Sequence, residues 1–168
     1  MITSTSDVVL GKSQFYISNG DISNFTDFQW RVKQSNSKKI IAKMIRGQKC
    51  VTAEKLFDEF AAVLQFPFYF GENWDAFEEC LNDLTWLQAD AYVLCISNVE
   101  NILKLSNTDF EAFASILESS VKEWEEGRDF GAIQTVPTPF NIVFHCAKDT
   151  EQVFIKKLNG FGIVLEKI

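Results

Sequence analysis

The chain has 168 residues, of which 46% are hydrophobic and 23% charged, and its formal net charge is −7. This length suits one domain, and this composition supplies a buried core, which excludes a disordered chain. The acidic balance argues against a nucleic-acid binder, because phosphate contacts need basic side chains. No apolar run approaches the roughly 18 residues that cross a bilayer, and residues 1–7 lack the character of a secretory signal. We therefore expect no association with membranes.

Cysteine usage indicates the cellular compartment. The four cysteines lie far apart and show no metal-ligand spacing: Cys50, Cys80, Cys95 and Cys146. Cysteines at this density are typical of reduced, buried thiols in a cytosolic protein. The sequence thus predicts four free thiols, no metal site and a cytoplasmic location.

The elements expected first along the chain are a strand and a helix. Residues 14–17 are a weak strand candidate, 35–37 have loop character, and the Ile-rich segment 39–46 predicts a strand. Thr52 is a suitable N-cap for a helix that ends before Pro67. The apolar residues of this helix repeat at helical spacing: Leu56, Phe60, Val63 and Leu64.

The middle of the chain adds a second helix and a buried strand. Residues 68–71 form an aromatic loop, and a helix is expected from Asn73, as its N-cap, to Leu84. The continuous apolar run 91–96 predicts a strand that is buried on both faces. A short helix is expected over 99–105.

The last part of the chain predicts two helices and two strands. Thr108 and Glu111 fit a capping box that starts a long amphipathic helix, which ends near Gly127. A strand, a helix and a final strand follow at 141–146, 149–160 and 161–166.

The order of these elements predicts the fold class. Strands that alternate with helices favour crossover connections, which join parallel neighbours in a sheet. We therefore predict a single α/β domain with a mostly parallel sheet that is flanked by helices. Its central strands would be 39–46, 91–96 and 141–146, and further strands would extend the sheet.

The helix expected over 73–84 has two chemically different sides. On a helical wheel, the apolar side collects Trp74, Phe77, Cys80, Leu81 and Leu84. The polar side collects Asp75, Glu78, Glu79, Asn82 and Asp83. Like-charged neighbours three or four residues apart each destabilise a helix by roughly 0.2–0.5 kcal/mol. No Lys or Arg between Lys55 and Lys104 relieves this repulsion locally.

Acidic side chains are concentrated in the middle of the chain. Residues 51–147 carry 17 acidic and 4 basic side chains. Glu123, Glu125 and Glu126 lie near the end of the long helix, where the helix dipole disfavours anions. A solvated surface tolerates such clusters, but a cationic partner gives their field a use. The sequence therefore favours a cation-binding surface.

A resemblance to a known family begins within this acidic region. The segment 66–86, FPFYFGENWDAFEECLNDLTW, closely resembles the core motif of the barstar family of intracellular ribonuclease inhibitors. The Pro, the aromatic pair, Gly-Glu-Asn, Asp-Ala and Cys-Leu match in register. A weaker resemblance covers 38–146. Residues 1–37 would be an N-terminal extension, and 147–168 a helix-and-strand addition to the same domain.

The resemblance implies an inhibitor rather than an enzyme. Proteins of this family plug the basic active-site cleft of a secreted or toxic ribonuclease, in a 1:1 complex and without a cofactor. Carboxylates would occupy the places that RNA phosphates take, and their long-range field would speed association. The implied role is immunity of the cell against the nuclease.

The resemblance also implies which residues meet the partner. Tyr69 would lie against the mouth of the nuclease cleft, while Gly71 and Asn73 would shape the start of the acidic helix. Asp75 would meet a basic residue of the enzyme. Glu79 takes the position of the family's central aspartate, which anchors the inhibitor in the phosphate pocket, and its side chain is one methylene longer.

Three further contact positions complete the set that the resemblance implies. Glu78 replaces an aromatic residue of the family, and Phe70 replaces a tyrosine. Glu123 is the best placement for a carboxylate that contributes near the end of the long helix. These replacements bear on which nuclease is recognised more than on the inhibitor role.

Other functions remain open from the residues alone. His145, the single histidine, neighbours Cys146 on an expected strand, where adjacent side chains face opposite ways, so no catalytic dyad is expected. Asp75 and Glu79 have oxygen ligands suited to Mg²⁺ or Ca²⁺, but no third ligand clusters with them. An acidic adaptor for another basic protein, and an immunity protein against a toxin that does not cleave RNA, share the same surface.

Overall fold

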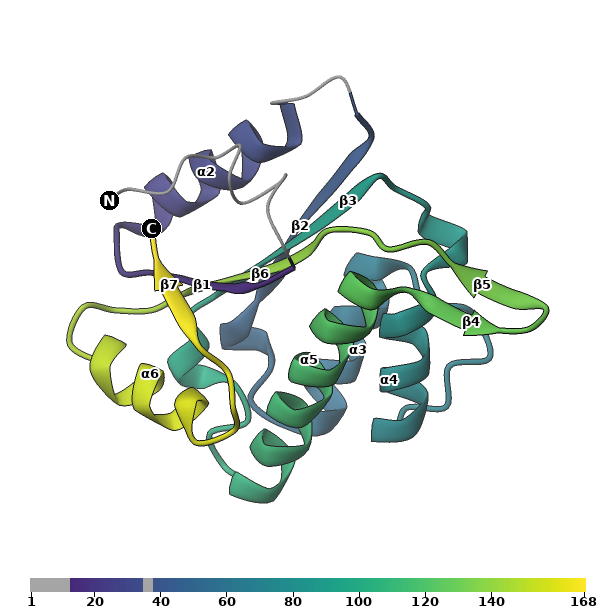
Figure 1. Cartoon of the computed structure of the whole chain (residues 1–168). Coiled ribbons are helices and arrows are strands. Elements are labelled where there is room, and N and C mark those ends of the chain that lie inside the picture. Colours follow the sequence, from purple (N-terminus) through teal and green to yellow (C-terminus); the bar gives the residue numbers. More distant parts are fainter. Residues whose placement is uncertain (1–12, 35–37) are drawn as a thin grey trace.

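The computed structural model describes residues 13–34 and 38–168. In this part of the chain, a parallel sheet has the strand order β2-β3-β6-β1-β7 (Figure 1). Its strands are β1 (Phe15–Ser18), β2 (Ile40–Arg46), β3 (Ala91–Ser97), β6 (Phe140–His145) and β7 (Leu165–Lys167). A separate antiparallel hairpin is formed by β4 (Arg128–Phe130) and β5 (Ile133–Thr135).

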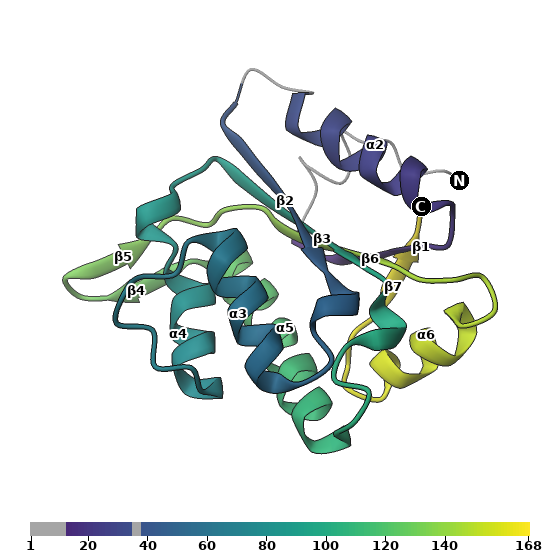
Figure 2. The same cartoon turned by 180° about the vertical axis from the view of Figure 1, so that it is seen from behind.

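Helices cover both faces of the sheet (Figures 1 and 2). One face carries α3 (Ala53–Leu64), α4 (Trp74–Asp83), α5 (Asn107–Glu126) and α6 (Glu151–Asn159). The other face carries α2 (Ile22–Gln34), which packs mainly against β2. In both views α4 and α6 lie at opposite ends of the helical layer. The single-domain α/β fold predicted from the sequence is confirmed.

Strand β3 shows why the sheet is covered twice. All of its residues are buried. Tyr92 and Leu94 belong to the larger core beneath α3, α4, α5 and α6, whereas Val93 and Cys95 belong to the smaller core beneath α2. Residues 91–96 of this central parallel strand are therefore apolar at every position rather than at alternate ones.

The three expected strands and the N-caps Thr52 and Asn73 are confirmed, but β2 is an edge strand of the sheet rather than a central one. Strands β2, β3 and β6 coincide with the predicted segments, and they are parallel neighbours in the sheet. The side chain of Thr52 accepts a hydrogen bond from the N–H of Lys55, and that of Asn73 accepts one from Ala76. Both caps satisfy backbone donors that would otherwise lack partners at a helix start.

The start of the long helix differs from the prediction. Its N-cap is Ser106 rather than Thr108, because the Ser106 hydroxyl accepts the N–H of Asp109 at 3.2 Å. The helix thus starts two residues earlier than the capping-box pattern places it, and the capped donor is the N–H of Asp109 rather than that of Glu111.

Two other expected elements are shorter than predicted. The helix expected over 99–105 is a single 3₁₀ turn at Val99–Asn101. Strand β7 occupies only the end of the segment 161–166 and extends one residue beyond it. Short apolar segments have no periodicity long enough to fix such ends.

A helix and a β-hairpin were missed by sequence reasoning. Helix α2 follows Asp21, whose carboxylate accepts the N–H of Ser23 at 2.8 Å, and it buries Phe25 and Val32. This Asp-x-Ser start and the seven-residue apolar spacing are the signals that could have found it. The β4–β5 hairpin has strands too short to show an alternating pattern.

All four cysteines are free and buried, as predicted. Burial raises the pKa of Cys50 to about 12 and those of Cys80 and Cys146 to about 11. These thiols therefore stay protonated near neutral pH and are poor nucleophiles.

An ion pair between the buried Glu59 of α3 and the exposed Arg46 of β2 predicts acid-sensitive stability. Glu59 accepts hydrogen bonds from Nε and Nη2 of Arg46, both at 2.8 Å, and from its backbone N–H at 3.0 Å. Burial opposes ionisation, but the hydrogen bonds from Arg46 outweigh it and hold the pKa of Glu59 below its usual 4.5. The ionised carboxylate of Glu59 therefore stabilises the fold at pH values above 4.5. This stabilisation is lost as the pH falls through the lowered pKa that Glu59 has in the folded protein.

We expect Glu59→Gln to lower the denaturation midpoint at pH 7, and the gap to the wild type to narrow below about pH 4. Urea denaturation at several pH values measures both effects. Asp58→Asn, at an exposed position in the middle of the same helix, is the control and should change neither. A gap of equal size at neutral and acid pH would contradict the role of the ionised carboxylate.

Candidate functional site

The start of α4 is held by a compact polar turn. Asn73 Oδ1 accepts the N–H of Ala76 at 2.9 Å, and Asn73 Nδ2 donates to the carbonyl of Gly71 at 3.2 Å. A Cβ atom at Gly71 would lie 3.1 Å from Asn73 Nδ2 and 3.6 Å from the Cβ of Ala76. A side chain at this glycine would therefore crowd the cap, so the two residues shape the entry into the helix.

The solvent-facing side of α4 carries three carboxylates, which we call the acidic face: Asp75, Glu79 and Asp83. Asp75 and Glu79 are exposed, and Asp83 is half-buried. None of the ion pairs found between described residues involves this face. The acidic face therefore projects an uncompensated negative field into solvent.

A small pocket opens beside the acidic face. Its volume is about 200 Å³, and it is lined by Tyr69, Phe70, Ala76, Glu79, Cys80 and Asp83. Burial raises the pKa of Cys80, and the charges of Asp83 and Glu79 raise it further, so both carboxylates act on this spot. Two carboxylates beside aromatic rings form a pocket that suits a cationic side chain.

The aromatic loop before α4 has an inward and an outward part. The Phe70 ring packs against Phe57 and Phe66, with ring centroids 5.9 and 5.0 Å away. Tyr69 is 72% exposed, and Phe68 is fully exposed. Phe70 therefore belongs mainly to the core, whereas Tyr69 faces solvent. Sequence reasoning missed Phe68, because three successive aromatics carry no local signal of which one points outward.

Helix α5 covers one flank of α4 and uses part of its polar side. Glu78 accepts a hydrogen bond from the hydroxyl of Ser119 at 2.9 Å. On α5 itself, Glu123 forms an ion pair with Arg128 of the hairpin. Asn82 was expected on the polar side, but it is buried, with 4% of its surface exposed. The freely exposed carboxylates are thus fewer than the helical wheel predicts.

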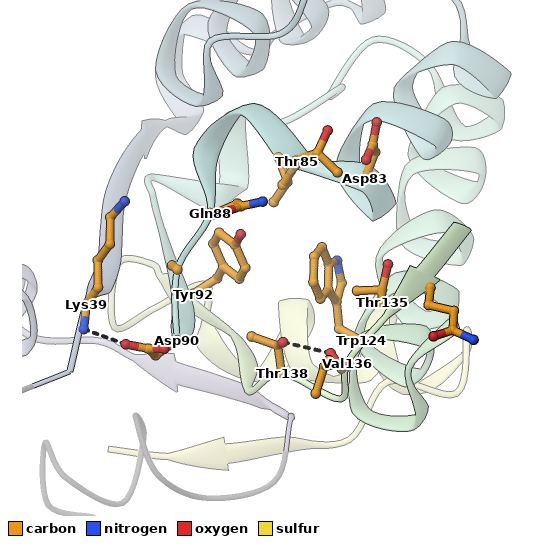
Figure 3. Close-up of a pocket in the computed structure, with 13 residues that line it drawn as sticks. Lys39, Asp83, Thr85, Gln88, Asp90, Tyr92, Trp124, Thr135, Val136 and Thr138 are labelled. Atoms are coloured by element: carbon orange, nitrogen blue, oxygen red, sulfur yellow. Dashed lines mark hydrogen bonds between the residues drawn. The ribbon is translucent and has the colours of Figure 1, made fainter. Parts of the chain in front are cut away.

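A larger pocket of about 420 Å³ lies at the carboxyl end of α4 (Figure 3). Tyr92 and Trp124 form its apolar wall, and their polar atoms already have partners. The Tyr92 hydroxyl donates to the carbonyl of Leu87 at 2.8 Å, and Trp124 Nε1 donates to that of Leu81 at 3.0 Å. Asp83 lines both this pocket and the smaller one, so the two adjoin at this carboxylate.

The single histidine has structural partners. His145 Nε2 lies 2.8 Å from the carbonyl oxygen of Gly20, its Nδ1 accepts the N–H of Asn98, and its ring stacks on Phe25. Cys146 belongs to the core on the opposite face of the sheet, so these neighbours point apart, as predicted.

Among the described residues, no three His, Cys, Asp or Glu side chains gather into a metal-binding group. No described helix is both long and apolar enough to cross a membrane.

A comparison with known protein families finds a match over the region that contains this site. The family described as barstar (barnase inhibitor) matches residues 42–136. No curated protein sequence matches the chain. The matched range begins within β2, includes α3, α4, β3 and α5, and ends just after β5. Because this match covers more than half of the chain, together with the whole acidic face and the aromatic loop, the protein belongs to the barstar family, whose members are inhibitors rather than enzymes.

Proposed function

We propose that this protein inhibits a ribonuclease by placing the acidic face of α4 in the cationic active-site cleft of the enzyme. The observation that carries the proposal is an acidic face without ion-pair partners among the described residues, within the part of the chain that matches the family. On this proposal the chain forms a 1:1 complex, is not itself an enzyme and needs no metal or cofactor. It acts in the cytoplasm, where it protects the cell against a secreted or toxic nuclease.

The exposed residues have distinct roles in this proposal. Glu79 enters the pocket in which the ribonuclease holds an RNA phosphate, and Asp75 pairs with a neighbouring basic side chain. Tyr69 lies against the mouth of the cleft. Glu78 and Glu123 already have partners in the free protein. They therefore contribute negative charge at the border of the contact and do not bind the enzyme directly.

The electrostatics of α4 support a cationic partner. The carboxylates of Asp75, Glu79 and Asp83 repel one another at helical spacing, and only Asp75 lies in the first turn, where the helix dipole favours an anion. A contribution to the stability of the fold therefore does not explain the carboxylates of Glu79 and Asp83. A cleft that binds phosphates supplies the opposite charge.

The described residues of the outer segments lie away from the acidic face (Figure 1). We propose that 38–146 is the barstar-like unit and that 1–37 and 147–168 extend it. Within the described residues, β1 pairs with β6, and β7 pairs with β1, so these segments continue the sheet away from β2. Helix α6 lies at the far end of the helical layer from α4 (Figure 1).

The direct test is inhibition of RNA cleavage. Barnase, for which the family's inhibitors are named, is incubated with increasing amounts of this protein and assayed on a fluorogenic RNA substrate. We expect activity to fall to zero near a 1:1 molar ratio. Binding without inhibition would instead indicate an acidic adaptor. Full activity in the presence of excess protein would contradict a barnase-type target.

The steering role of the acidic face predicts a salt-dependent association rate. Between about 0.01 and 0.5 M salt the screening length falls from about 30 Å to a few Å, so the association rate should fall steeply. The dissociation rate should change much less, because close contacts are screened weakly. Stopped-flow mixing with barnase over this range measures both. An association rate that does not depend on salt would contradict electrostatic steering by the acidic face, but it would not contradict binding.

A further inference from the structure

The most exposed large apolar side chain on the described surface is Phe68, which is fully exposed. Its neighbour Tyr69 is 72% exposed. Val164 has no aromatic neighbour in the sequence, and Phe154, the aromatic neighbour of Val153, is buried. Isolated exposed apolar residues are ordinary in soluble proteins, but a contiguous aromatic pair beside a proposed binding site marks an interaction surface.

The backbone holds this aromatic pair in place. The N–H of Phe70 donates to the carbonyl of Pro67 at 2.9 Å, so Phe68 and Tyr69 are the two central residues of a tight turn. Both ends of the turn are fixed, since Phe70 packs into the core and the N–H of Phe66 donates to the carbonyl of Ala61. The Phe68 ring is therefore presented on a fixed turn, and little conformational entropy is lost when a partner covers it.

The charge beside the pair indicates what covers it. Tyr69 lines the small pocket whose other walls include the carboxylates of Glu79 and Asp83. A second copy of this chain, docked by the same surface, would place these carboxylates against each other. A basic protein would instead bring opposite charge to the pocket and a surface for the rings.

We propose that Phe68 is a partner-contact residue, and that it docks with Tyr69 against an apolar rim of the cationic cleft on the inhibited nuclease. This inference rests on the proposed inhibitor function and adds a specificity element to it. The acidic face brings the two proteins together, and Phe68 then slows their separation, because its burial depends on close contact rather than on charge.

The experiment measures binding of Phe68→Ala to barnase by surface plasmon resonance at several salt concentrations. We expect dissociation to be about ten- to a hundredfold faster than for the wild type. The association rate and its salt dependence should stay within about twofold, since no charge is lost. Thermal unfolding should be unchanged, because Phe68 has no core contact. Phe68→Leu should restore much of the slow dissociation, and Val153→Ala on α6 is the matched control with no expected effect.

The possible outcomes separate this inference from the proposed function. If Phe68→Ala dissociates from barnase as slowly as the wild type, while Glu79→Ala binds weakly, the role of Phe68 is overturned and the inhibitor function stands. Absence of barnase binding by the wild-type chain would contradict a barnase-type target and overturn the contact proposed for Phe68 with it. A wild-type dimer in sedimentation that Phe68→Ala abolishes would assign the pair to self-association and overturn the inference.

Discussion

Replacing Glu79 by Ala is expected to weaken binding to the nuclease by more than about 2 kcal/mol, because a desolvated cationic pocket then loses its partner. The measured range behind this figure includes the barnase–barstar pair itself. Glu79 is exposed and forms no ion pair with another described residue, so the fold does not depend on it. The free variant should therefore match wild-type stability within about 0.5 kcal/mol, or exceed it slightly, since two like-charged neighbours are relieved.

Two companion variants make the Glu79 result specific. Glu79→Gln keeps the shape but not the charge, and it should be almost as harmful as Ala. Asp83→Ala is the control, since it lies one turn further along α4, and it should cost less than about 1 kcal/mol. Chemical denaturation and affinity for barnase are measured for each variant. Normal binding by Glu79→Ala together with weak binding by Asp83→Ala would show that the contact face must be shifted along the helix.

Replacing Phe77 by Ala is expected to have the largest effect on the fold, a loss of about 3–5 kcal/mol in the free energy of unfolding. Phe77 lies on the opposite side of α4 from Glu79 and is fully buried. Its ring contacts those of Phe60 at 5.0 Å, Trp74 at 5.8 Å and Phe57 at 5.9 Å, in tilted or edge-on arrangements. Truncation would leave a cavity among rings that pack α4 against α3 and α5.

Urea denaturation of Phe77→Ala measures this cost. The matched control is Phe68→Ala, which removes the same side chain from a fully exposed position and should change stability by less than about 0.5 kcal/mol. Phe77→Leu, which fills more of the space, should lie between the wild type and the Ala variant. A loss below about 1 kcal/mol for Phe77→Ala would mean that other contacts dock α4.

The candidate site was only partly predictable from local sequence. Asn73, Asp75 and Glu79 have the cap, first-turn and solvent positions that their spacing indicates. Glu78 and Glu123 belong to the same acidic clusters, yet each has an intramolecular partner. The partner of Glu78 comes from α5, whose approach to α4 is not encoded in the periodicity of either helix. The partner of Glu123 is Arg128, which lies just beyond the end of α5 at the start of the hairpin.

The sequence by itself determined the elements whose patterns are long and regular. Apolar spacing located α3, α4 and α5, continuous apolar runs located β3 and β6, and side chains such as Thr52 marked helix starts. These features follow from interactions between residues a few positions apart, so a single segment contains all the information that they need.

Only the tertiary structure decided which residues of these elements are free to bind. Asn82 is buried, Glu78 is bonded to Ser119 of α5, and the turn at Pro67 leaves Phe68 exposed while Phe70 packs into the core. The weakly patterned α2 takes its place because the second face of the sheet needs a cover. Apart from α2, which has weak local signals, these outcomes depend on contacts between segments distant in the chain, which no local pattern encodes.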